Sequence, residues 1–160
     1  MTKAITRNIR TGSELSQAVV FLQNQSSFPL QMIIKPGKEP RSIQQNRLAF
    51  QWYKDAAEQG DHSPEEYRAL CKLWYGVPIL RAEDDEFRAK YDKVVKQMPY
   101  ETKLALMDEP FDFPVSRLMS VKQMTRYLDK IWFHFSSKGF QLTDPALIGI
   151  DDYAKWERAA

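Results

Sequence analysis

The sequence predicts an α+β fold, with a single mostly helical domain over residues 1–160 and a small β-sheet near the N-terminus. Two observations lead to this prediction. Several segments combine a serine helix cap, a glutamine or glutamate three residues later, and apolar residues at helical spacing. The start of the chain is different, because it has the pattern of a strand, a helix and a second strand.

Length and composition describe a globular protein. A chain of 160 residues can bury a core within one domain, and apolar residues make up 43% of it. No run of about 18 apolar residues is present, so we expect no membrane contact. We also see no signal peptide, and the single cysteine, Cys71, excludes an intrachain disulfide. These features agree with a cytoplasmic protein.

The N-terminal segment carries the expected sheet. Residues 3–10 and 30–35 are the two predicted strands, and the second of them, LQMIIK, is bounded by proline on both sides. Residues 11–25 lie between the strands as a predicted helix with an apolar stripe. Such a unit gives a small sheet covered by one helix.

A central helix is predicted within residues 40–59. Ser42 can cap it and Gln45 completes a capping box, while Gly60 is expected to end it in a left-handed conformation. Its apolar arc is wide, so we expect the helix to be buried on most sides. Gln45 and Asn46 lie within that arc, and buried amides need hydrogen-bond partners. We interpret them as structural residues, with a functional cleft as the alternative.

The second half of the chain has four predicted helices, at residues 63–75, 84–97, about 102–107 and 120–138. Gly76 and Pro78 are expected to end the first of these helices. The last helix opens with a further capping box and has the clearest apolar stripe of the chain, in which we include Trp132.

Charge favours an anionic partner. Residues 1–54 hold eight Lys and Arg against two Asp and Glu, a net charge of +6, whereas the rest of the chain has a net charge of −4. The candidate DNA-binding residues are Lys35, Lys38, Arg41, Arg47 and Lys54 near the central helix, and Lys122, Arg126 and Lys130 on the late helix. The last three are also compatible with a solvated helix face. Trp52, Tyr53 and Trp74 could stack on unpaired bases, although their apolar faces favour the core.

Catalysis has weaker support. A metal-dependent nuclease would need clustered carboxylates, and Asp108, Glu109 and Asp112 are the best candidates, although acidic runs are more typical of solvated loops and helix starts. Neither histidine has a second ligand at metal spacing, and no nucleophile elbow or glycine-rich phosphate loop is present. We therefore expect no catalytic residue, metal or cofactor. A protein-interaction module without DNA contact is a further alternative.

The motif Arg-Ser-x-x-Gln-Asn-Arg at residues 41–47, followed by an aromatic-rich helix, resembles the phage NinB (Orf) family of recombination proteins. The resemblance covers residues 1–60, and beyond them only the order of elements is similar. It implies a homodimeric mediator that binds single-stranded DNA in the host bacterial cell. It also implies cooperation with the host single-strand-binding protein in loading a recombinase. The alternative is a metal-dependent phage nuclease, or another DNA-processing enzyme, that uses Asp108, Glu109 and Asp112.

Overall fold

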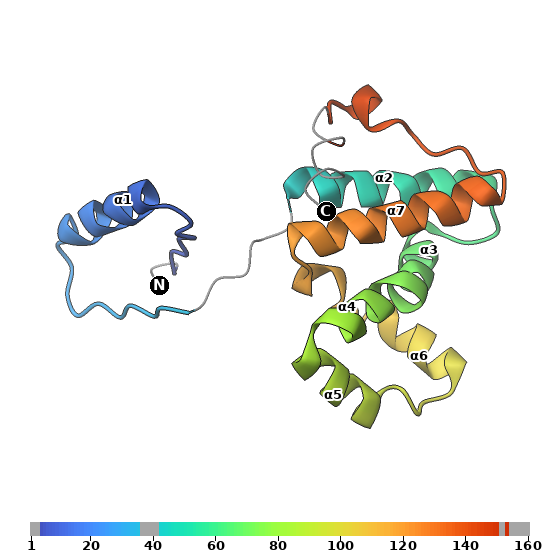
Figure 1. Ribbon diagram of the computed structural model, residues 1–160, viewed down its shortest axis with the longest axis horizontal. Helices are drawn as coiled ribbons and strands as arrows, with labels where there is room; N and C mark the ends of the chain where they lie inside the picture. Colours follow the sequence, from blue (N-terminus) through green and yellow to red (C-terminus); the bar gives the residue numbers. More distant parts are fainter. Residues whose placement is uncertain (1–3, 36–41, 151–152, 154–160) are drawn as a thin grey trace. The chain divides into compact units, whose positions relative to one another are not determined.

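The structure, a computed structural model, describes residues 4–35, 42–150 and 153 (Figure 1). The chain divides into two compact units, Met1–Lys38 and Glu39–Ala160. None of the helices in the described part of the chain is long and apolar enough to cross a membrane.

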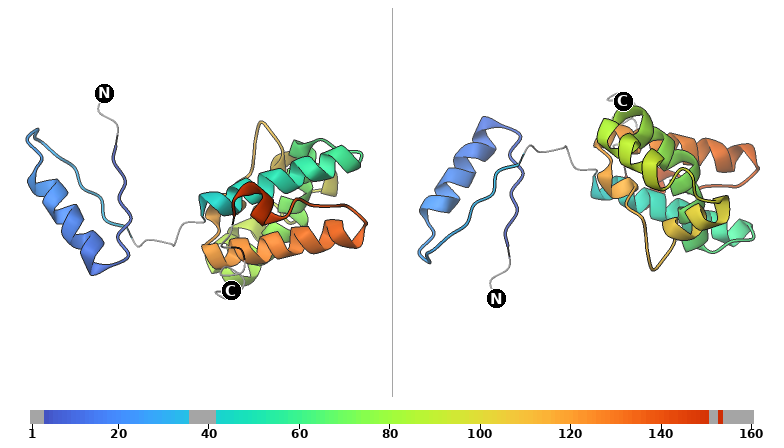
Figure 2. Two further views of the ribbon diagram at one scale, coloured as in Figure 1. Left: turned by 90° about the horizontal axis from the view of Figure 1, so that it is seen from above. Right: turned by 90° about the horizontal axis from the view of Figure 1, so that it is seen from below.

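Within residues 4–35, the N-terminal unit contains one helix, α1 (Gly12–Gln23), with an irregular segment on either side of it (Figure 2). The predicted α+β fold is wrong, because no residue in the described ranges belongs to a β-strand. An extended segment becomes a strand only when its backbone pairs with another strand about 4.8 Å away. The apolar patterns at residues 4–10 and 30–35 are present, but these segments have no such pairing.

Two long helices, α2 (Ile43–Gln59) and α7 (Val121–Ser137), form the centre of the second unit (Figure 1). Each begins with the predicted capping box, which is confirmed at both positions. The two helices lie side by side and run in the same direction, so their N-terminal ends are neighbours. Gly60 ends α2 in an extended conformation, with φ −123°, so the predicted left-handed end is wrong.

The side-chain amide of Gln45 joins the starts of these two helices. It is fully buried, and its Nε2 donates to the Thr125 hydroxyl at 3.0 Å and to the Val121 carbonyl oxygen at 3.2 Å. Its Oε1 accepts from the backbone N–H of Ser42 at 3.2 Å. Gln45 therefore fastens the start of α2 to α7, whereas the neighbouring Asn46 is only half-buried.

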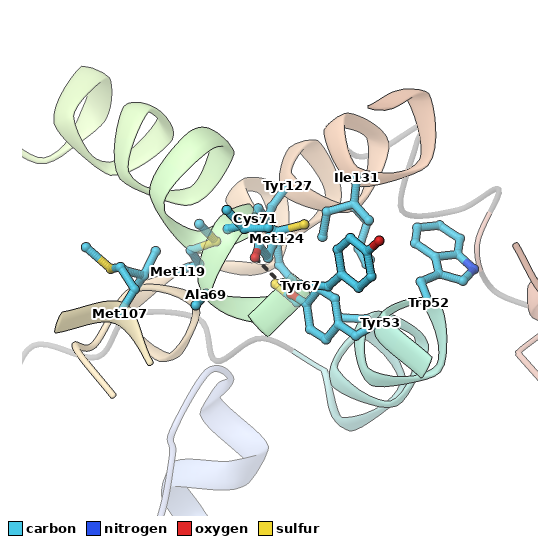
Figure 3. Packing of buried hydrophobic residues seen from close by; sticks show 14 of the residues in the cluster. Trp52, Tyr53, Tyr67, Ala69, Cys71, Met107, Met119, Met124, Tyr127 and Ile131 are labelled. Carbon is cyan, nitrogen blue, oxygen red and sulfur yellow. Dashed lines mark hydrogen bonds between the residues drawn. The ribbon is translucent and has the colours of Figure 1, made fainter. Parts of the chain in front are cut away.

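The core lies between α2, α7 and the helices that follow α2 (Figure 3). The hydroxyl groups of Tyr53 and Tyr127 share a buried hydrogen bond of 2.8 Å there. Cys71 is fully buried beside them, as predicted, and burial raises the pKa of its thiol. The thiol is therefore an inert core group rather than a nucleophile.

One side of the α2–α7 pair is covered by a continuous helical segment. It consists of α3 (Pro64–Cys71), the π-helical turn η1 (Lys72–Gly76) and α4 (Val77–Glu83). The predicted end at Gly76 and Pro78 is wrong. The π-turn changes the hydrogen-bond register, so that the backbone N–H of Val77 donates to the Lys72 carbonyl oxygen, and Pro78 lies in the first turn of α4.

The remaining elements are α5 (Asp85–Val94), α6 (Tyr100–Met107) and the short 3-10 turns η2 (Ser116–Leu118) and η3 (Pro145–Ile148). The segment that contains η3 crosses the other side of α2 and α7, away from α4 (Figures 1 and 2). The paired helices are thus the middle layer of this unit.

Replacing Gln45 by leucine is expected to lower the free energy of unfolding by about 1–3 kcal/mol, because buried polar groups on α7 and at the start of α2 lose a partner. Urea denaturation measures this change. The matched control is Gln44→Leu at the adjacent, half-buried position, which is expected to change stability by less than about 0.5 kcal/mol. Equal stability of the two variants would contradict the joining role of Gln45.

Candidate nucleic-acid interface

The exposed face of α7 carries a row of cationic side chains. Lys122, Arg126 and Lys130 recur every fourth residue, and all three are exposed. We call these three residues the basic row. Phe133 follows one turn later on the same face and is 70% exposed. The row therefore ends at an aromatic ring in contact with solvent. Phe133 was not among the residues predicted from the sequence, although its spacing from Lys130 places it on the same helix face.

Trp132 lies beside the end of the basic row. The sequence placed it in the apolar core stripe, but its side chain is 50% exposed, so that prediction is wrong. Ile131 and Phe135 fill the core-facing positions of this turn and are buried. The arc of the helix that holds Trp132 instead faces a cavity.

This cavity has a volume of about 740 Å³ and lies between α2, α7 and the C-terminal segment. Its lining residues are Trp52, Asp129, Lys130, Trp132, Phe133, Leu142, Thr143, Asp144, Pro145 and Tyr153. The lining thus combines aromatic rings, two carboxylates and the last cation of the basic row.

The polar groups of the cavity are held in place by local hydrogen bonds. The indole N–H of Trp52 donates to the Thr143 carbonyl oxygen at 2.9 Å, and this bond fixes the C-terminal segment against α2. Asp129 Oδ1 accepts from the Tyr153 hydroxyl at 3.0 Å. Asp144 Oδ1 accepts from the backbone N–H of Ala146 at 2.9 Å and so caps η3.

The basic residues differ in how much of their charge is available to a ligand. Arg126 forms an ion pair with Glu83, and its Nη2 lies 2.6 Å from Glu83 Oε2. Arg47 donates to the Ile148 carbonyl oxygen on the C-terminal segment. Lys122 and Lys130 have no ion pair among those found in the described residues. These two lysines are therefore the most available cations of the row.

The other predicted DNA contacts are more scattered. Lys54 is exposed on α2, and Lys35 is exposed in the N-terminal unit. Lys38 and Arg41 lie outside the described residues. The structure therefore brings together Lys122, Arg126 and Lys130 on one helix face, whereas Lys35 belongs to the other compact unit.

The three aromatic residues first considered for base stacking do not form one surface. Trp52 and Tyr53 are 1% and 3% exposed and belong to the core. Trp74 is 37% exposed, but its indole N–H donates to the Tyr100 hydroxyl at 3.0 Å and its ring packs against His134. Stacking on this protein would therefore use other rings.

Asp112, one of the three acidic candidates for catalysis, is engaged by two cations. Arg68 and Lys72 each donate to its carboxylate at 2.7 Å, and these hydrogen bonds lower the pKa of Asp112 to about 2. Lys72 is 1% exposed and also donates to the Met107 carbonyl oxygen at 2.8 Å. Asp112 thus compensates a buried lysine and ties its own loop to the helical segment that starts with α3.

The other acidic candidates do not complete a metal site. Asp108 Oδ1 accepts from the backbone N–H of Glu109 at 2.8 Å, a contact typical of a loop. Within residues 4–35, 42–150 and 153, no group of three or more His, Cys, Asp or Glu side chains could hold a metal ion.

Comparisons with models of known protein families, with characterised proteins and with solved structures found no match. The resemblance to the NinB family therefore rests on the motif at residues 41–47, and the argument for a site rests on the geometry of α7.

Replacing Asp112 by alanine is expected to lower the free energy of unfolding by about 1–3 kcal/mol, because Lys72 would stay buried without its carboxylate, and the 44% exposure of the Asp112 side chain reduces the full cost of a broken buried pair. The matched control is Asp85→Ala, which removes an exposed ion pair with Arg88 and is expected to cost less than about 1 kcal/mol. Urea denaturation at neutral pH compares the two variants.

The pH dependence provides a second measurement on the same variant. The pKa of Asp112 falls from 3.8 to about 2 on folding, so its contribution is present above the unfolded value and is lost as the pH falls toward 2. Wild type should therefore lose more stability than Asp112→Ala over this interval. A variant as stable as wild type at neutral pH would contradict the structural role of Asp112.

Proposed function

We propose that the protein is a non-enzymatic mediator of homologous recombination that binds single-stranded DNA in the cytoplasm of a host bacterium. In this proposal it assists recombinase loading together with the host single-strand-binding protein. One observation carries the DNA-binding part, namely that the basic row on α7 ends at two exposed aromatic rings, Trp132 and Phe133. The recombination part is supported by the resemblance of residues 41–47 to the NinB family.

Single-stranded DNA is the ligand that this combination of side chains suits best. Proteins that bind single strands pair a cationic track for the phosphates with aromatic rings on which bases stack. From Lys122 to Lys130 the row spans about 12 Å along the helix axis, which is long enough to contact about two or three successive phosphates of a strand. A duplex keeps its bases stacked inside, so the exposed rings favour an unpaired strand.

Replacing Lys122 and Lys130 by glutamate is expected to weaken binding of an oligothymidylate about tenfold or more, because two phosphate contacts are lost and two repulsions are gained. Fluorescence anisotropy at several salt concentrations measures this effect. Each lost contact should also reduce the slope of log affinity against log salt by about 0.7. Arg126 is left unchanged because its substitution would also unpair Glu83.

The matched control replaces Lys93, in the last turn of α5, and Lys96, just after that helix, by glutamate. Both lysines are exposed, and the change in net charge is the same. Binding by this control should stay close to wild type, and both variants should melt like wild type. A variant in which Arg47 and Lys54 are replaced by glutamate tests whether the bound DNA strand also contacts α2. Equal loss of affinity in the α7 and α5 variants would contradict a site on α7, and DNA cleavage that requires a divalent metal would favour a nuclease.

We also propose that the protein is a homodimer. In the N-terminal unit, α1 buries only Ala18. Taken by itself, the unit leaves a set of large apolar side chains at least 40% exposed, namely Ile5, Ile9, Leu15, Val19, Val20, Leu22, Phe28, Leu30, Met32, Ile33 and Ile34. Exposed apolar surface on this scale is typical of an interaction site. A second copy can cover it symmetrically, because the same surface is present on both chains.

Sedimentation equilibrium at micromolar concentration is expected to give twice the 18.7 kDa mass of one chain. Replacing Phe28 and Ile34 by serine should shift the protein toward the monomer, because both side chains are more than 70% exposed and apolar. The control replaces Ile43 and Leu147 in the second unit, which are 84% and 80% exposed, and should remain dimeric. A wild-type protein that sediments only as a monomer would contradict this proposal.

A further inference from the structure

We propose that the cavity beside the basic row receives one unpaired base of the bound strand and prefers bases that carry an exocyclic amino group. This inference rests on the proposed binding of single-stranded DNA and adds to it a specific subsite. It predicts a base preference that phosphate contacts alone do not give.

The walls of the cavity suit a flat aromatic ligand. Trp52 and Leu142 belong largely to the packed interior, whereas Trp132 and Phe133 are 50% and 70% exposed. Exposed aromatic side chains such as these are the groups on which unpaired bases stack. The volume of about 740 Å³ lies within the range of small-molecule sites and leaves ample room for one base.

The position of the cavity agrees with a strand that follows the basic row. Lys130 belongs to the row and also lines the cavity. A phosphate that contacts Lys130 therefore brings its nucleoside to the mouth of the cavity. Rotation of one base away from the strand would place it against Trp132 or Phe133.

The charges in the cavity favour the base over the phosphate as the occupant. Asp129 and Asp144 both line it, and two carboxylates repel a phosphate group. A carboxylate at neutral pH only accepts hydrogen bonds, and it has about four acceptor positions. The bonds from Tyr153 and from the backbone of Ala146 each use one position, so acceptor capacity remains.

Acceptors in the cavity select the bases that donate. Cytosine presents an amino group where uracil and thymine present a carbonyl oxygen. The amino group can donate to Asp129 or Asp144, whereas the carbonyl oxygen would face a carboxylate oxygen and be repelled. A cationic side chain of another protein would also suit the aromatic rings and carboxylates, but Lys130 would repel it.

The test compares oligodeoxycytidylate with oligodeoxyuridylate of equal length, using the full-length protein and fluorescence anisotropy at one salt concentration. Deoxyuridine is chosen because, like deoxycytidine, it lacks the methyl group of thymine. One additional hydrogen bond is expected to give a preference for the cytosine strand on the order of fivefold. The double variant Asp129→Asn and Asp144→Asn should bring this ratio close to one, because an amide both donates and accepts. Asparagine at position 144 keeps the cap of η3.

Two ring substitutions test the stacking part. Trp132→Ala with Phe133→Ala should weaken binding of both strands about tenfold. The control, Phe111→Ala, removes a ring that is 71% exposed outside the cavity and should leave binding unchanged. Circular dichroism and thermal melting confirm that each variant is folded.

The outcomes separate this inference from the proposed function. Equal affinity of the wild type for both strands, with loss of binding in the Lys122 and Lys130 variant, would overturn the base subsite and leave DNA binding intact. An unchanged ratio in the Asp129 and Asp144 variant, or unchanged binding without the two rings, would also overturn it. Absence of binding to either strand would overturn the proposed function itself.

Discussion

The parallel packing of α2 on α7 is the constraint on which the second unit depends. Placing two helix N-termini side by side brings like ends of their dipoles together, which is unfavourable by a fraction of a kcal/mol to about 1 kcal/mol. The buried amide of Gln45 offsets this cost, because it bonds to Thr125 and Val121 at that end. Farther along, the hydrogen bond between Tyr53 and Tyr127 fixes the same register. The positive ends of both helices consequently lie where the basic row begins.

This packing also determines what α7 presents to solvent. Once Thr125 faces α2, helical periodicity turns Leu128, Ile131 and Phe135 inward and the basic row outward. Trp132 lies between these two faces. The C-terminal segment is held to α2 through Trp52 and does not bury Trp132, so the cavity remains between that segment and α7. The position of the candidate site therefore follows from the packing of α2 on α7.

Local signals in the sequence predicted the helix starts well, because a cap depends on residues three positions apart. The capping boxes of α2 and α7 are examples. Features that depend on distant partners were not predictable. The helical segment continues through Gly76 because this residue packs where an added Cβ would lie 2.5 Å from a Val115 methyl group, and Val115 is remote in sequence. The pairing of strands in a sheet and the exposure of Trp132 also depend on residues that are far apart in sequence. At the candidate site, the sequence identified the basic row, but not the cavity or the pairing of Arg126 with Glu83.

The pairing of Arg126 with Glu83 bears on whether the basic row is only a solvated helix face. An exposed ion pair contributes about 0–1 kcal/mol, so a phosphate can replace Glu83 beside Arg126 at little cost. Arg126 can therefore still contact a phosphate group. A solvated face of a helix has no need of large rings, yet Phe133 continues the row and Trp132 lies beside it, both in contact with solvent. Cations alone fit either interpretation, and the two exposed rings are what favour a surface for unpaired bases.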